Sequence, residues 1–362
     1  MSHTTTKSVL HHPIPYMTSA ELFVDTLLRR KAGKVPLMLR DLTLGLDVLN
    51  VPTNAVFGER YDAELSARCV LALRDMMGSD VTMGCISTYS LEAFGGLTKY
   101  PSDGIPYVSG YPLADIDRLD EFQSGMIVSD LLKGMRRSCE IVKEQRPELG
   151  LCVNVPGPMT MAGFFRGVET LMMDVITEPD LAGRIVDFSV DVISDEMRFL
   201  YDGIADAVFL ASATDNPDMI GDEAYRSLVL EGLRDLTEQA HSDDVPVIYH
   251  PHGVFSTDDR VELLNASLDT GIDGFQFSEG NEPSGILESC EGRCAVLGGV
   301  NAYSTLLLGP EKRIVRDTNR FLDELADHHY IMTCSCSVNR GLPLQNLKVM
   351  SDTLHAFNEG RE

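Results

Sequence analysis

The sequence contains no tryptophan and is poor in basic residues, with 30 lysines and arginines against 55 aspartates and glutamates and a formal net charge of −25. Such a charge repels nucleic-acid backbones and anionic membranes, and we find no local basic patch. No apolar run approaches the roughly 20 residues that a bilayer span requires. The first 15 residues lack the apolar core of a secretory signal. We therefore expect a cytoplasmic protein that binds neither nucleic acid nor membrane.

The cysteine content points to reduced thiols or metal ligands. Eight cysteines are spread over 362 residues, and the expected absence of a secretory signal argues against a disulfide framework. Hydrophobic residues make up 44% and charged residues 23% of the chain, which are ordinary values for a globular protein. Extended disorder is therefore not expected.

Eight short apolar segments recur along the chain, each separated from the next by enough residues for at least one helix. They are almost continuously apolar, as is typical of parallel strands buried on both faces. The segments are residues 35–39, 81–85, 151–155, 207–211, 245–249, 274–277, 295–299 and 330–334.

Helical periodicity fills the intervals between these segments. The pattern is clearest over residues 178–201, 258–268, 312–326 and 347–357. Eightfold alternation of strand and helix predicts an α/β fold, a single (β/α)8 TIM barrel, with a doubly wound sheet as the alternative. We expect one domain over residues 19–362, a flexible lead over residues 1–18, an extra N-terminal helix over residues 19–31, and long loops or lids after the first two strands.

Barrel enzymes place their active sites at the C-terminal ends of the strands. His250 and His252 follow the fifth predicted strand, and residues two apart in an extended segment point to the same side. Cys334 and Cys336 follow the last strand. Two imidazoles and one thiolate form a three-ligand set with an open position, as in catalytic zinc sites. Strand-end histidines that only bind backbone groups, and cysteines that only fill the core, are the alternatives.

Further polar or sulfur-bearing residues at strand ends are candidates for the same site. We expect Glu279 to act as a general acid or a fourth zinc ligand, and Asp215 to orient substrate or accept a proton. Four more residues are expected to bind substrate: Arg40, Cys85, Asn154 and Asn301. The alternatives are a solvated carboxylate for Glu279, a local ion pair for Arg40 and barrel packing for Cys85.

Several segments resemble the uroporphyrinogen decarboxylase superfamily. Residues 247–253, Val-Ile-Tyr-His-Pro-His-Gly, resemble its strand-end signature, and residues 157–162, 270–276 and 295–301 show similar motifs. Cys336, followed by the run Pro343-Leu344-Gln345-Asn346, is similar to the last-strand loop of that superfamily. The resemblance extends over about residues 20–358 and implies the TIM barrel. It also favours Cys336 over Cys334 as the sulfur ligand.

The superfamily has two main branches. Decarboxylases carry an Arg-Gln-Ala-Gly-Arg motif near the N-terminus, of which the corresponding region here keeps only Arg40. Cobalamin-dependent methyltransferases carry a zinc motif His-x-Cys-Gly and a distant Cys. His250, His252, Gly253 and Cys336 match those positions, with His252 where the family usually has cysteine. The resemblance thus implies Zn2+ held by His250, His252 and Cys336, and a corrinoid (cobalamin) carried by a partner protein.

The presence of His252 in place of the family's usual cysteine predicts the direction of methyl transfer. Zinc bound by two nitrogens and one thiolate keeps a formal charge of +1 and is a stronger Lewis acid than a neutral site with two thiolates. We therefore hypothesise methyl transfer from a small methylated substrate to the cobalt of a corrinoid protein. Transfer from the methyl-corrinoid to a coenzyme M-type thiol is the first alternative. A decarboxylase and a non-enzymatic barrel are less favoured, and the sequence does not predict the oligomeric state.

Overall fold

The computed structural model describes residues 17–30, 33–58, 60–88, 90–122 and 128–361, so the predicted N-terminal lead lies almost entirely outside the described residues. The predicted first helix is confirmed as α1 (Ser19–Leu27). Thr18 and Glu21 form a capping box at its start, in which each side chain accepts a hydrogen bond from the other residue's backbone N–H.

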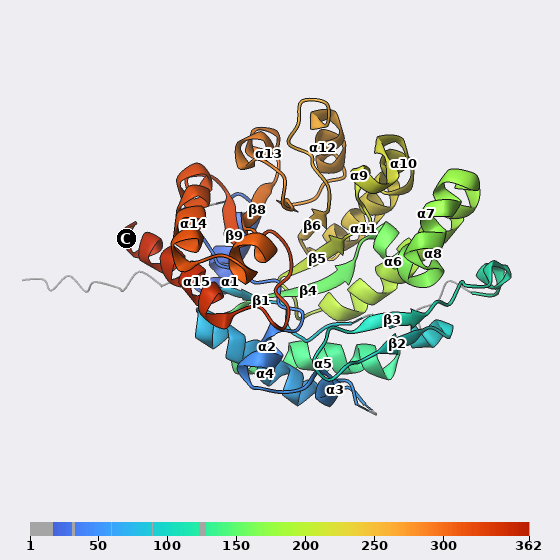
Figure 1. Ribbon diagram of the computed structural model, residues 1–362, viewed down its shortest axis with the longest axis horizontal. Helices are drawn as coiled ribbons and strands as arrows, with labels where there is room; N and C mark the ends of the chain where they lie inside the picture. Colours follow the sequence, from blue (N-terminus) through green and yellow to red (C-terminus); the bar gives the residue numbers. More distant parts are fainter. Residues whose placement is uncertain (1–16, 31–32, 59, 89, 123–127, 362) are drawn as a thin grey trace, which may run out of the picture.

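A curled parallel sheet of seven strands forms the centre of the fold, with helices arranged around its outer side (Figure 1). Its order is β1-β4-β5-β6-β7-β8-β9, so strands that follow one another within this sheet are also neighbours in it. The strands are β1 (Val81–Thr82), β4 (Gly150–Pro156), β5 (Ala207–Ser212), β6 (Val247–Pro251), β7 (Gly274–Gln276), β8 (Ala295–Val300) and β9 (Tyr330–Cys334). The α/β class and the parallel order are confirmed.

The prediction of eight regular strands is wrong at the first segment. Residues 35–39 form only single bridges to the two edge strands, Leu37 with Met332 and Met38 with Val81. Pro36 has no N–H to donate to a ladder, and the N–H of Asp41 turns back to the carbonyl of Leu39 at 2.8 Å. The gap between β9 and β1 is therefore spanned by isolated bridges rather than by an eighth strand.

The helices predicted from hydrophobic periodicity are confirmed. The four predicted helices correspond to α8 (Pro179–Tyr201), α12 (Val261–Leu268), α14 (Glu311–Leu325) and α15 (Leu344–Glu359). The remaining helices are α2 (Leu44–Val48), α3 (Thr53–Val56), α4 (Ala63–Met77), α5 (Asp130–Gln145), α6 (Pro158–Arg166), α7 (Val168–Thr177), α9 (Pro217–Ile220), α10 (Asp222–Leu228), α11 (Leu230–Ser242) and α13 (Pro283–Cys290). Short 3-10 turns η1 (Glu92–Phe94) and η2 (Ile116–Glu121) and a π-helix η3 (Ala302–Leu307) complete the set.

The long connection after the second predicted strand contains a feature that the periodicity did not predict. An antiparallel pair, β2 (Leu97–Lys99) and β3 (Tyr107–Gly110), lies there as a separate two-stranded sheet. Its residues alternate between exposed and half-buried positions. In the described part of the chain, no helix combines the length and apolarity needed to cross a membrane.

Two apolar clusters pack on opposite faces of the parallel sheet. The inner cluster includes Phe209, Ile248 and Leu297 together with Phe23 and Leu27 of α1. The outer, larger cluster fills the space between the strands and the surrounding helices. Because side chains alternate along a strand, the residues two positions after Ile248 and Leu297 also face inward. On β6 that residue is His250.

Candidate metal centre

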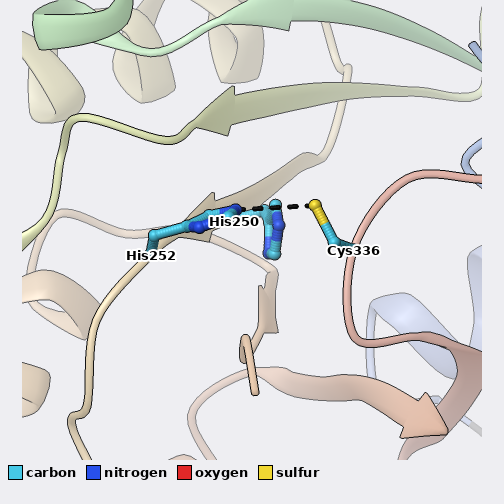
Figure 2. A group of neighbouring side chains, drawn as sticks. All are labelled: His250, His252 and Cys336. Carbon is cyan, nitrogen blue, oxygen red and sulfur yellow. Dashed lines mark hydrogen bonds between the residues drawn. The ribbon is translucent and has the colours of Figure 1, made fainter. Parts of the chain in front are cut away.

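The structure brings His250, His252 and Cys336 together at the C-terminal ends of the strands. Their candidate ligand atoms, two imidazole nitrogens and one sulfur, all lie within 4.8 Å of one another. Figure 2 shows the thiol of Cys336 directed at the two rings, with the Sγ of Cys336 3.5 Å from Nε2 of His252. This separation is close enough for one metal ion to be bound by all three residues with a small rearrangement.

Strand pairing determines where the two histidines point. His250 is the fourth residue of β6 and is fully buried, and Ala211 of β5 lies beside it in the ladder. The N–H of His252 continues the pairing by donating to the carbonyl of Ser212 at 3.1 Å. Both side chains consequently face the inside of the curled sheet, as their spacing of two predicts.

A backbone hydrogen bond fixes the imidazole of His250. Its Nδ1–H donates to the carbonyl oxygen of Gln276 at 3.0 Å, since a carbonyl can only accept. Nε2 is therefore the unprotonated nitrogen, and it is buried without a hydrogen-bond partner among the described residues. A metal-binding histidine commonly has this arrangement, in which one nitrogen donates to a carbonyl and the other binds the ion.

The protonation states also suit a metal. Burial alone would raise the pKa of Cys336, but the two adjacent imidazoles and the charge of Arg40 lower it to about 3, so the sulfur is a thiolate. Burial lowers the pKa of His250, which keeps that ring neutral. The hydrogen bond to Cys336 raises the pKa of His252. A buried neutral imidazole with an unpartnered nitrogen beside a thiolate fits zinc, which prefers nitrogen and sulfur ligands.

Two of the predicted substrate-binding residues lie beside this centre. Arg40 approaches Cys336, with 3.9 Å between Nη1 and Sγ. Its Nε–H donates to Oδ1 of Asn154 on β4 at 2.9 Å, and its guanidinium lies 5.2 Å from the centre of the Phe209 ring. The positive charge of Arg40 is thus held next to the thiolate by an amide and an aromatic face.

Asp215 follows β5 but is not brought to the three metal-ligand candidates. Its fully buried carboxylate accepts hydrogen bonds from the backbone N–H of Met159 at 2.9 Å and from the hydroxyl of Tyr249 at 3.0 Å. Tyr249 alternates with His250 on β6 and belongs to the outer cluster. Desolvation raises the pKa of Asp215 to about 6. These contacts tie Asp215 to the start of α6.

Cys85 and Asn301 have other partners. Cys85 is buried and hydrogen-bonds the thiol of Cys139 on α5, a contact that raises the pKa of Cys139. The side chain of Asn301 caps the π-helix η3, accepting from the N–H groups of Tyr303 at 3.0 Å and Ser304 at 2.7 Å. The contact of Cys85 with Cys139 agrees with barrel packing, the alternative given for this residue. The amide oxygen of Asn301 already accepts two hydrogen bonds within η3.

Glu279 and Cys334 lie near the centre without joining it. Glu279 is exposed after β7, and its charge contributes to the raised pKa of His252. It lines a cavity of about 340 Å³ with Asn301 and Arg313, among other residues. Cys334 is buried among outer-cluster residues, and desolvation raises its pKa to about 12. Of the two cysteines, the geometry groups Cys336 with the histidines.

Gln276 and Thr333 are functional candidates that sequence reasoning missed. Both are fully buried on inward-facing strand positions, and each carries a side-chain oxygen without a hydrogen-bond partner among the described residues. The signal in the sequence was a polar residue inside an apolar strand, flanked by Phe275 and Phe277 in one case and by Met332 and Cys334 in the other.

Comparison with known proteins identifies the family. The sequence model of the uroporphyrinogen decarboxylase (URO-D) family matches residues 18–357. The chain belongs to the uroporphyrinogen decarboxylase family. It is 21% identical over 294 residues to the methylcobamide:CoM methyltransferase MtaA of Methanosarcina barkeri, covering 78% of this chain and 76% of that protein.

Two further relatives of this family member are methyltransferases. The methylated-thiol–coenzyme M methyltransferase of Methanosarcina mazei is 27% identical over 192 residues, covering 53% of this chain and 49% of that protein. A solved methyltransferase structure from Methanosarcina mazei superposes with a TM-score of 0.78 at 20% sequence identity, covering 94% of this chain and 99% of that one. The structural likeness confirms the fold, and the curated relatives confirm the predicted resemblance to the methyltransferase branch.

Proposed function

We propose that the protein is a zinc-dependent methyltransferase that moves a methyl group between a small substrate and the cobalt of a corrinoid carried by a partner protein. The observation that carries this proposal is the convergence of His250, His252 and Cys336 within 4.8 Å at the C-terminal ends of β6 and β9. The names of the relatives, which include a methylcobamide:CoM methyltransferase, support the reaction class.

In this proposal, some residues hold the metal and others bind the substrate. His250, His252 and Cys336 would hold zinc, which when bound supplies Lewis acidity toward the heteroatom that carries or receives the methyl group. Gln276 orients His250 through its backbone carbonyl. Arg40 places a fixed positive charge beside the sulfur, and Glu279 offers a carboxylate at the rim as a proton donor or acceptor.

The preferred direction is demethylation of a small methylated substrate onto cobalt. Two nitrogens, one thiolate and the neighbouring Arg40 give a loaded site a net positive charge, which favours activation of an oxygen- or nitrogen-bound methyl donor. Methylation of a coenzyme M-type thiol is the second candidate, and the names of the two Methanosarcina relatives, both coenzyme M methyltransferases, favour it.

A methyl-transfer assay distinguishes the two directions. The zinc-loaded protein is incubated either with free methylcob(III)alamin and a panel of thiols, or with cob(I)alamin and small methylated oxygen and nitrogen compounds. Our preferred direction predicts methylcobalamin formation in the second reaction and slow thiol methylation in the first. Rapid thiol methylation by the wild type would reverse the direction.

The variant His252→Cys tests the physical reason for this preference. It restores the ligand set usual in the methyltransferase branch and removes one positive charge from the loaded site, so thiol methylation should increase relative to demethylation. Turnover of a carboxylated substrate by metal-free protein, with no methyl transfer in either direction, would instead support a decarboxylase.

A further inference from the structure

Four buried polar residues lie on the inner face of the sheet beside the candidate metal centre: Arg40, Asn154, Gln276 and Thr333, referred to here as the polar floor. Asn154 pairs with inward-facing Phe209, and Gln276 pairs with inward-facing Leu297. Thr333 follows inward-facing Ile331 by two positions. Paired residues of parallel strands point to the same side, so these side chains form one layer on top of the inner apolar cluster.

The hydrogen bonds of this floor fix which groups remain unpaired. Oδ1 of Asn154 accepts from Arg40, so its unpaired Nδ2 is a donor. Nε2 of Gln276 donates to the carbonyl of Cys334 at 2.8 Å, so its unpaired Oε1 is an acceptor. The Thr333 hydroxyl is unpaired as well and can do either.

Leaving these groups unpaired is unfavourable. A buried polar group without a partner opposes folding, because it has lost its hydrogen bonds to water, and three such groups lie in one layer. The guanidinium of Arg40 is buried too, and among the described residues no carboxylate lies within ion-pairing distance of it. A donor, an acceptor and a hydroxyl thus lack partners in this layer, next to a guanidinium whose charge faces only the Cys336 thiolate and the Phe209 ring.

We propose that the polar floor binds the small substrate and that this substrate is an acid that also carries a hydrogen-bond donor, such as a 2-hydroxy or 2-amino acid. Its acid group pairs with Arg40 and with Nδ2 of Asn154, and its hydroxyl or amine donates to Oε1 of Gln276. Thr333 bridges the two ends. That the bound acid is the substrate rests on the proposed function, whereas binding of the acid itself requires no metal.

The probes are acetate, glycolate and acetamide, titrated calorimetrically into the full-length chain freed of metal by chelation. Acetamide tests for the negative charge, and glycolate differs from acetate by one hydroxyl. We expect glycolate to bind more tightly than acetate, and acetate more tightly than acetamide. A charge-assisted hydrogen bond contributes about 1.5–3 kcal/mol, so Arg40→Met should weaken both anions about tenfold or more.

Three variants make the assignment specific. Gln276→Met should abolish the preference for glycolate over acetate while leaving acetate binding unchanged. Arg40→Lys, which keeps the charge, should restore part of the anion affinity and so exclude misfolding as the cause of the loss. Arg316→Met removes an exposed arginine of α14 and should change nothing.

The proposal is overturned if acetamide binds as well as acetate, if Arg316→Met weakens anions as much as Arg40→Met does, or if none of the three probes binds, which would leave a floor filled by water. The variant His252→Ala separates this result from the proposed function. It should abolish zinc binding and methyl transfer but retain anion binding. Wild-type protein that binds glycolate yet holds no zinc would contradict the methyltransferase proposal alone.

Discussion

A single thiol dominates the chemistry of this protein at the scale of individual residues. Cys336 is only half-buried, whereas the seven other cysteines are buried. Its neighbours are two imidazoles and a guanidinium, all of which favour the thiolate, and they outweigh the desolvation that opposes it. The sulfur is therefore a thiolate at every physiological pH, which is the form that binds a metal ion.

This electrostatic setting predicts an unusual alkylation profile for Cys336. In metal-free protein its pKa is about 3, so the thiolate fraction is constant between about pH 5 and about pH 8. The rate of iodoacetamide labelling at Cys336, followed by peptide mass spectrometry, should therefore be nearly independent of pH over that range. Buried Cys334, whose pKa is about 12, is the internal control and should remain unlabelled.

The variant His252→Ala removes one of the partners that stabilise the thiolate, so its labelling rate should fall at the acidic end of the range. A wild-type rate that drops about tenfold for each unit of pH would instead describe an ordinary thiol with a pKa near its usual value. That outcome would remove the electrostatic argument for a metal ligand.

At the scale of secondary-structure elements, Asp215 connects three of them. Its carboxylate joins the end of β5 to the N-terminal backbone of α6 and to the Tyr249 hydroxyl on β6. Gly157, which precedes α6, approaches so closely that a Cβ there would lie 2.6 Å from Oδ2 of Asp215. These contacts indicate that Asp215 positions α6 against the sheet.

Substitutions of Asp215 should therefore affect folding before chemistry. Asp215→Ala leaves the buried N–H of Met159 without a partner and the Tyr249 hydroxyl with Tyr225 alone, and it should lower the free energy of unfolding by roughly 1–3 kcal/mol. Asp215→Asn should be milder and should retain bound zinc. A variant as stable as the wild type that has lost methyl transfer would give Asp215 the catalytic role expected from its position after β5.

The same residue predicts a pH dependence with a definite sign. Desolvation raises the pKa of Asp215 to about 6, so between about pH 4 and pH 6 the folded chain binds more protons at this site than the unfolded chain. Its contribution to stability therefore decreases as the pH rises through this range. Denaturant unfolding should show the stability of Asp215→Asn improving relative to the wild type from about pH 4 to about pH 7.

The sequence predicted most elements but not all of their contacts. Continuous apolar runs located the seven regular strands, and the spacing of two between His250 and His252 predicted that both face one point. The strand prediction failed at residues 35–39, where Pro36 and the turn at Asp41 limit pairing to single bridges. The contact between Cys85 and Cys139 was also not evident from the sequence, and Gln276 was not singled out, because which face of a strand is the inner one depends on the whole sheet.

At the scale of the whole molecule, charge is unevenly distributed between the surface and the site. The chain carries a formal net charge of −25, yet its buried centre contains Arg40 beside two imidazoles. An anionic substrate would therefore be repelled at long range and bound at short range. The interior has to supply all of the attraction, which is consistent with the buried position of Arg40.

The excess of negative charge predicts how salt affects stability. Self-repulsion destabilises the folded state, and salt screens it with a Debye length of about 8 Å at physiological ionic strength. The Tm of metal-free protein should therefore rise when sodium chloride is increased from about 0.02 M to about 0.2 M, measured by calorimetry at neutral pH. A fall in Tm would show that the surface ion pairs, such as Arg146 with Asp75, contribute more than the net repulsion costs.

Zinc content measured by elemental analysis tests the central claim most directly. Wild-type protein expressed with zinc should contain one zinc ion per chain, and Cys336→Ser and His250→Ala should each lose it. Cys334→Ser, which changes the neighbouring buried cysteine outside the candidate ligand set, should keep it. Wild-type protein without zinc, or a Cys336→Ser variant that retains it while Cys334→Ser does not, would contradict the account.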